Sequence, residues 1–127
     1  MTPKVKICGI TTIDDALEAA WAGADALGFV FYKKSKRYIE PSEARTIIAL
    51  LPPWIVKVGL FVNEKRETVK KIARQCILDF VQLHGDEDKT YLRQLDNLRI
   101  IKAIRIQDER SLKQRDNLPC ELLLFDT

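Results

Sequence analysis

The sequence predicts an α/β protein with a parallel β-sheet, and three observations support this fold class. Short apolar runs recur about every 20 to 30 residues, as in successive βα units. These runs are continuous rather than alternating, which is typical of strands that are buried on both faces of a parallel sheet. Between the runs lie segments whose apolar residues recur at helical spacing. The chain is therefore expected to form six strands and five helices.

The predicted strands are the apolar runs themselves, at residues 5–10, 26–32, 55–62, 78–83, 100–106 and 122–125. The first helix is expected after Thr12, which with Asp15 resembles a capping box. Its inward face would consist of Ala16, Leu17, Ala20 and Trp21, and Gly23 suits its C-terminal end.

The second helix is expected to begin at Pro41, since proline is tolerated in a first turn, and to stop before Pro52. Asn63 is the expected cap of the third helix. Asp86 or Asp88 would begin the fourth. The fifth, at 108–115, contains only Leu112 as an apolar anchor and has the weakest helical pattern.

Two architectures fit this order of elements: an open doubly wound sheet, or part of a (βα)8 barrel. A complete barrel typically needs about 200 residues or more, and this chain has 127. Periodicity alone does not distinguish between the two.

Composition, net charge and cysteine spacing limit the kinds of protein that this chain can be. With 46% hydrophobic and 31% charged residues, the chain is expected to form one globular domain, residues 1–127. No apolar run approaches the roughly 18 residues that span a bilayer, and no secretory signal opens the chain, so a cytoplasmic protein is expected. A net charge of +3 without a basic stripe argues against nucleic-acid binding. Three cysteines without CxxC spacing predict neither a disulfide framework nor a metal site, and Cys76 and Cys120 are interpreted as structural.

Cys8 and Asp126 are the strongest candidates for chemistry. Each ends or closely follows a predicted strand, and the carboxyl ends of parallel strands form the rim at which ligands bind. A thiol and a carboxyl facing one pocket can serve as base and acid. The carboxyl would need a raised pKa to act as an acid near neutral pH, through burial or a nearby negative charge. From the residues alone, a buried core cysteine and a helix-capping aspartate are the alternatives.

Several motifs together resemble one enzyme family. They are K-I-C-G-I-T, A-L-G-F-V-F-Y-K-K-S-K-R-Y-I-E-P, K-V-G-L-F-V-N, V-Q-L-H-G-D-E, I-I-K-A-I-R and L-L-F-D-T. In order and spacing they resemble phosphoribosylanthranilate isomerase, a (βα)8-barrel enzyme of tryptophan biosynthesis. The resemblance implies an aldose–ketose type isomerisation, the Amadori rearrangement of N-(5-phosphoribosyl)anthranilate to 1-(2-carboxyphenylamino)-1-deoxyribulose 5-phosphate, without cofactor or metal.

The resemblance also implies roles for individual residues. Cys8 would be the base and Asp126 the acid. Arg37 would bind the anthranilate carboxylate, with a solvated loop arginine as the alternative. His84, the single histidine, would contact the substrate, although a structural hydrogen bond is an equal alternative. Gly9 is expected to allow close backbone approach, as is Gly85.

The chain departs from the family at its end, because the last two βα units and their phosphate-binding loops are absent. A partial barrel with exposed sheet edges is expected to be inactive alone and to associate with itself or with the missing segment. Two rival functions stay open: another phosphate-binding barrel enzyme of a related pathway, and a non-catalytic six-stranded α/β module that binds a carboxylate ligand or a partner protein.

Overall fold

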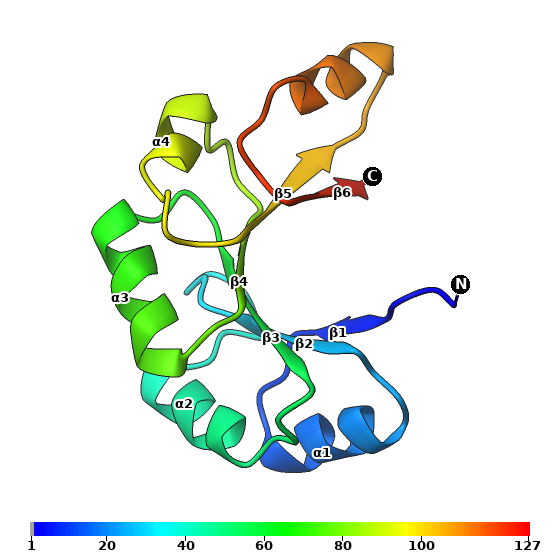
Figure 1. Ribbon diagram of the computed structural model, residues 1–127, viewed down its shortest axis with the longest axis vertical. Helices are drawn as coiled ribbons and strands as arrows, with labels where there is room; N and C mark the ends of the chain where they lie inside the picture. Colours follow the sequence, from blue (N-terminus) through cyan, green and yellow to red (C-terminus); the bar gives the residue numbers. More distant parts are fainter. Residues whose placement is uncertain (1) are drawn as a thin grey trace.

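Six parallel strands lie side by side in the order in which they occur along the chain. The computed structural model describes residues 2–127. Each strand pairs only with its neighbours in sequence, so the first and sixth strands are the two edges of a curved, open sheet (Figure 1). The strands are β1 (Lys6–Cys8), β2 (Ala26–Val30), β3 (Val56–Phe61), β4 (Phe80–Leu83), β5 (Ile100–Arg105) and β6 (Leu122–Asp126).

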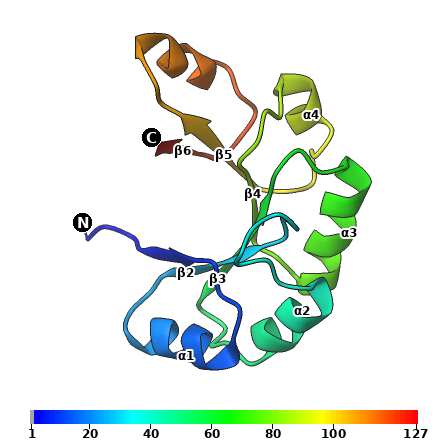
Figure 2. The same ribbon diagram turned by 180° about the vertical axis from the view of Figure 1, so that it is seen from behind.

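The helices cover the convex side of this sheet, and the concave side is left open (Figures 1 and 2). They are α1 (Ile13–Trp21), α2 (Pro41–Ala49), α3 (Arg66–Cys76), α4 (Lys89–Arg93) and the 3-10 helix η1 (Glu109–Arg115). A doubly wound sheet reverses its strand order and carries helices on both faces. Because the strands follow their order in the chain and the helices lie on one side only, the arrangement is that of a barrel and not of a doubly wound sheet. Within residues 2–127, no helix is long and apolar enough to span a membrane.

The caps of the first two helices confirm the sequence signals. The Thr12 hydroxyl accepts a hydrogen bond from the Asp15 N–H at 3.2 Å. At the other end of α1, Gly23 has φ +104°, and its N–H and that of Ala24 bond back to Ala20 and Ala19, as in a Schellman motif. Pro41 lies in the first turn of α2, where its missing N–H costs nothing.

Three predictions about individual residues were wrong. Asn63 does not cap α3, which begins after Lys65; Asn63 has φ +49° and its side chain accepts from the Asp86 N–H instead. Trp21 is 74% exposed and Leu112 38% exposed. By contrast, the prediction that Asp86 or Asp88 begins the fourth helix is confirmed, because Asp88 caps α4. A cap or an inward face depends on how the chain turns before and after the helix, which local sequence does not specify.

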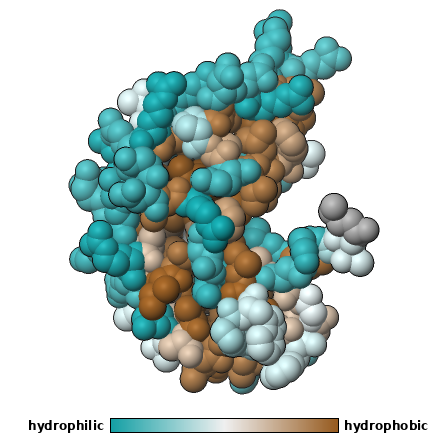
Figure 3. Space-filling model, viewed as in Figure 1, coloured by the Kyte–Doolittle hydropathy of each residue, from teal (hydrophilic) through white to brown (hydrophobic). Residues whose placement is uncertain are grey.

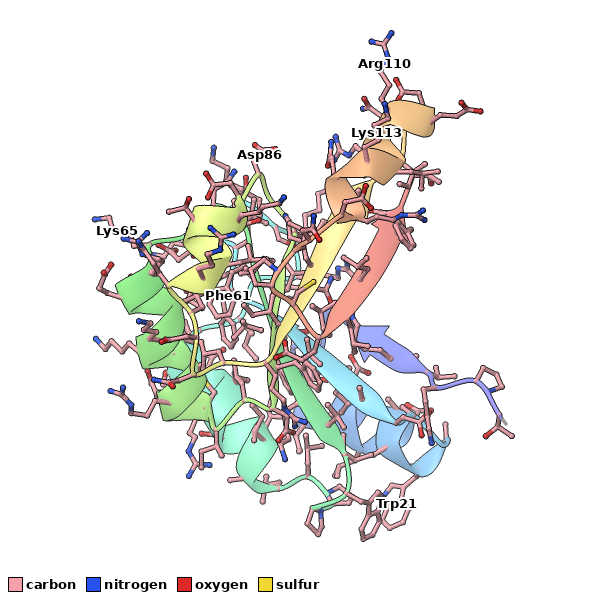
Figure 4. The ribbon with its side chains drawn as sticks, turned by 45° about the horizontal axis from the view of Figure 1, so that its top comes forward. Trp21, Phe61, Lys65, Asp86, Arg110 and Lys113 are labelled. Carbon is pink, nitrogen blue, oxygen red and sulfur yellow. The ribbon has the colours of Figure 1, made fainter. Side chains whose placement is uncertain are left out.

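The core lies between the sheet and the helices. Phe61 is fully buried, and its ring packs on that of Phe31 at 5.4 Å between centroids (Figure 4). Phe29 and Leu27 of β2 are fully buried with them. This outer layer needs only the helices present here, which explains why it is complete.

The edge strands are not buried on both faces, contrary to the expectation from their continuous apolar runs. Val5 and Ile7, at β1, are 47% and 42% exposed, and Leu122 and Phe125 of β6 are each 52% exposed. The space-filling view shows the C-shaped outline that results, with the two ends of the sheet separated by an open mouth (Figure 3). The edges carry the composition of interior strands but lack the neighbours that would cover them.

Tyr91 offers a pH test of the packing of α4. Its hydroxyl donates to the Glu64 carbonyl at 2.6 Å, and burial, with Glu87 and Glu64 nearby, raises its pKa to about 12. Below pH ~10 the phenol is protonated in both folded and unfolded chains. Between pH ~10 and 12 only the unfolded chain loses the proton, so stability should fall as pH rises. In a pH titration followed by tyrosinate absorbance, Tyr91→Phe should remove the ionisation step that occurs at the most alkaline pH. Loss of a step near pH ~10 instead would contradict the assignment of the raised pKa to Tyr91.

Candidate active site

The thiol of Cys8 lies on the concave face of the sheet. Cys8 pairs with Gly28 of β2, and a Cβ added at Gly28 would lie 2.7 Å from the Cys8 Sγ. Gly28 follows Ala26 by two residues, so both face the same side, and Ala26 lines the interior hollow at the opposite end of the strands. The absence of a side chain at Gly28 therefore makes room for the thiol at the rim.

We expect Gly28→Ala to destabilise the fold by about 1–3 kcal/mol, because the added methyl overpacks against the thiol. In a Cys8→Ala background most of this cost should disappear, since the nearest remaining Cys8 atoms lie at 3.2 and 3.3 Å. Urea unfolding of the wild type, the two single variants and the double variant measures the coupling free energy between the two positions. Strict additivity of the two substitutions would show that Gly28 does not make room for the sulfur.

Arg37 is fixed to the same corner of the rim. Its Nη1 donates to the Cys8 carbonyl at 3.0 Å. Gly9, at φ +93°, lies directly beneath it, and a Cβ there would be 2.5 Å from Arg37 Cδ. The expected close approach at Gly9 is confirmed, and so is that at Gly85, where a Cβ would lie 2.5 Å from Asn63 Oδ1. Arg37 is exposed, but one of its guanidinium nitrogens is held beside Cys8 by this hydrogen bond.

Asp126, at the end of β6, belongs to a chain of hydrogen bonds that begins on β4, the next strand but one in the sheet. The Gln82 Nε2 lies 3.0 Å from His84 Nδ1, and the His84 Nε2 lies 3.1 Å from Asp126 Oδ2. Gln82 is buried, whereas the side chains of His84 and Asp126 are 28% and 48% exposed. The Thr127 N–H donates to the other carboxylate oxygen at 2.9 Å. The only histidine therefore contacts the candidate acid directly, a pairing that β4 and β6 create across the sheet.

The electrostatics of Asp126 differ from what the sequence argument required. The hydrogen bond from His84, followed by that from the Thr127 N–H, lowers the pKa of Asp126, and slight burial only partly opposes this. The raised pKa that an acid near neutral pH would need is thus not found at Asp126. The physical reason is that Asp126 is half-exposed at an edge strand and meets hydrogen-bond donors rather than a second carboxylate.

A polar cavity of about 610 Å³ lies over the loops that follow β3, β4 and β5, with His84, Asn63, Arg105 and Ser111 among its lining residues. Asp86 stands on this rim, and Arg110 and Lys113 project from η1 above it (Figure 4). Cys8 borders a different cavity, of about 500 Å³, beside α1. A common pocket for Cys8 and Asp126 therefore stays a prediction. Among residues 2–127, no group of three acidic, histidine or cysteine side chains could hold a metal.

A buried ion pair beneath this cavity escaped the sequence argument. The Lys102 Nζ lies 2.9 Å from Glu87 Oε1 and donates to the Gly85 carbonyl at 2.7 Å. Glu87 also accepts from the N–H groups of Gly85 and Asn63. Its side chain is fully buried and that of Lys102 is 7% exposed. The available signal was a lysine inside an otherwise apolar strand, just as Gln82 interrupts the preceding one.

The sequence profile of the family described as "PRAI: N-(5'phosphoribosyl)anthranilate (PRA) isomerase" matches residues 5–127. The N-(5'-phosphoribosyl)anthranilate isomerase of Geotalea uraniireducens is 55% identical over 123 residues, covering 97% of this chain and 60% of that protein. That of Trichlorobacter lovleyi is 59% identical over 104 residues, covering 82% and 50%. The chain thus spans about half to three fifths of the length of these relatives.

Solved structures agree with this match. The phosphoribosyl anthranilate isomerase of Thermotoga maritima superposes with a TM-score of 0.93 at 43% identity, covering 99% of this chain and 63% of that one. A phosphoribosyl anthranilate isomerase in complex with reduced 1-(o-carboxyphenylamino)-1-deoxyribulose 5-phosphate superposes with a TM-score of 0.94 at 45% identity, covering 99% of this chain and 66% of that one. The curled, sequentially ordered sheet, with its helices on one side, is therefore a portion of a TIM-type barrel, and the chain belongs to the phosphoribosylanthranilate isomerase family.

Proposed function

We propose that the chain forms the N-terminal part of an enzyme that rearranges N-(5-phosphoribosyl)anthranilate to 1-(2-carboxyphenylamino)-1-deoxyribulose 5-phosphate. The observation that supports this best is the placement of Cys8 and Asp126 at the carboxyl ends of the first and sixth parallel strands. Cys8 pairs with Gly28, and Asp126 lies beside His84 at the end of β4, so both lie at the same rim of the sheet. The solved complex of a relative with a reduced form of this product supports the same substrate class.

In the proposed reaction, Asp126 acts as the acid that protonates the ribose ring oxygen. The C1′–O bond breaks, and the anthranilate nitrogen lone pair forms a Schiff base. Cys8 then removes the C2′ proton, and the electron pair moves to the nitrogen to give an enolamine, which tautomerises to the ketone. The overall change is an isomerisation, so neither an oxidant nor a metal is required for its balance.

The lowered pKa of Asp126 sets a condition on this mechanism. As an isolated half-exposed carboxyl it would be ionised near neutral pH. Covering it with bound substrate would remove water and favour the neutral form. The acid would therefore be ready only in the substrate complex of a closed barrel.

Arg37 is the proposed partner of the anthranilate carboxylate. Its guanidinium is already held beside Cys8, so it can present its free N–H groups to a planar anion. Arg37→Ala should raise the Michaelis constant by about 10- to 150-fold, from the loss of roughly 1.5–3 kcal/mol of charged hydrogen bonding. Lys36→Ala, in the same loop, is the matched control. Equal constants in both variants would return Arg37 to the role of a solvated loop residue.

Self-association, or capture of the missing strands, is the proposed behaviour of the 127-residue chain alone. Its edge strands expose Val5, Ile7, Leu122 and Phe125, together with unpaired backbone groups. The phosphate of the substrate would bind to loops after two further strands, by the general logic of such barrels. A biosynthetic enzyme of this family would work in the cytoplasm, without nucleic acid or membrane as partner.

The test compares the 127-residue chain with a chimera in which residues 1–127 are joined to the last two βα units of the Geotalea uraniireducens relative. We expect the chain alone to sediment as an oligomer or aggregate without turnover, and the chimera to be a closed, active barrel. A folded, inactive chimera would contradict the proposed activity. A monodisperse, active 127-residue monomer would contradict the need for the missing strands.

A further inference from the structure

Gln82 is a buried polar residue for which the proposed reaction gives no role. Its side chain extends from β4 toward the concave face and is 2% exposed. The amide nitrogen lies 3.0 Å from His84 Nδ1, whereas the amide oxygen is the one buried side-chain nitrogen or oxygen atom within residues 2–127 that lacks a hydrogen-bond partner. An orphaned buried oxygen costs free energy, so its presence beneath the site calls for an explanation.

When Asp126 is ionised and His84 is neutral, the hydrogen-bond chain has only one consistent direction. A carboxylate can only accept, so the proton between His84 and Asp126 must lie on His84 Nε2. A neutral imidazole then has an unprotonated Nδ1, which needs a donor. Within this chain, only the amide nitrogen of Gln82 can donate a hydrogen bond to Nδ1. With the nitrogen in that position, the amide oxygen points to a place where it has no hydrogen-bond partner. The cost at the oxygen is thus the consequence of presenting the nitrogen to His84.

We propose that Gln82 is a positioning residue that holds His84 as the neutral Nε2–H tautomer, so that His84 is a fixed donor to the Asp126 carboxylate. The role of Gln82 in holding His84 does not depend on the proposed function, and only its consequence for catalysis rests on that function. Asp126 is half-exposed at the end of an edge strand, and its side chain is oriented by just two donors, His84 and the Thr127 N–H. The opposite tautomer would place a lone pair against the carboxylate and release it from the rim.

The tautomer can be measured directly, because His84 is the only histidine in the chain. Histidine-labelled protein gives one pair of ring-nitrogen signals in NMR. In a barrel closed by adding the unlabelled last two βα units as a second fragment, we expect an unprotonated Nδ1 and a protonated Nε2 at His84 near neutral pH. Gln82→Glu replaces the donor with an acceptor and should place a proton on Nδ1. Gln82→Met keeps the volume but removes both polar atoms, and should move the signals toward the averaged positions of a solvated histidine. Gln75→Met, exposed on α3, should change neither signal.

Kinetics in the chimeric barrel supply the second readout. Gln82→Met should lower kcat by about tenfold with little change in KM, since the loss of one positioning hydrogen bond disturbs the acid more than binding. A protonated Nδ1 or averaged signals in the wild-type chain would overturn the inference, and so would wild-type signals in Gln82→Met. If the tautomer is fixed as described but the folded chimera shows no turnover, the proposed function fails while the role of Gln82 in holding His84 stands.

Discussion

Cys8→Ala and Asp126→Asn should each lower kcat in the completed barrel by about 10²- to 10⁴-fold, while the Michaelis constant changes little. Each variant removes a group that transfers a proton in the transition state, and proton transfer by a positioned side chain contributes a factor of this size. Both substitutions preserve most of the volume at the rim. Steady-state kinetics on the chimera measure the effect.

Two controls separate chemistry from folding in this experiment. Cys76→Ala removes a buried thiol that donates to the Pro41 carbonyl, and it should affect stability rather than turnover. Asp126→Asn retains an oxygen for His84 but cannot deliver a carboxyl proton. Near-normal turnover in both site variants would rule out the proposed acid and base.

Lys102→Met should destabilise the fold by about 3–5 kcal/mol, the largest effect expected for any single substitution considered. It would leave the fully buried Glu87 carboxylate without its cation and the Gly85 carbonyl without its donor. For a domain whose total stability is typically about 5–15 kcal/mol, such a loss would leave a substantial fraction unfolded. Urea unfolding of the closed barrel measures the difference.

The matched control is Lys4→Met, which breaks the exposed pair between Lys4 and Asp25 and should cost about 0–1 kcal/mol. Replacing both Lys102 and Glu87 by apolar residues should not fully restore stability. Glu87 also accepts the N–H groups of Asn63 and Gly85, which would then be buried without partners. Equal effects of Lys102→Met and Lys4→Met would show that the buried pair contributes no more than a surface one.

The buried pair also connects stability to the site. It ties the loops after β3 and β4 to β5 itself, and Gly85, one of its partners, directly follows His84. Loosening these loops should therefore disturb the direction in which His84 points at Asp126.

The sequence by itself determined the order and type of the elements. All six strands lie within two residues of their predicted ends, and all five helical segments occur. These features depend on local periodicity and on caps such as Thr12 and Pro41, which involve neighbours only a few residues away. Cys8 and Asp126 could be placed at strand tips for the same reason.

The tertiary structure alone decided the contacts between distant residues. The hydrogen bonds from Gln82 through His84 to Asp126 join two strands about forty residues apart, and the Lys102–Glu87 pair joins a strand to a loop. The sequence argument required a raised pKa for Asp126 to act as an acid, but the donor that β4 presents to it lowers that pKa. Burial also followed the fold rather than hydropathy: Ile7 and Phe125 have the composition of core residues, yet they are exposed because the strands and helices that would cover them are not their neighbours here.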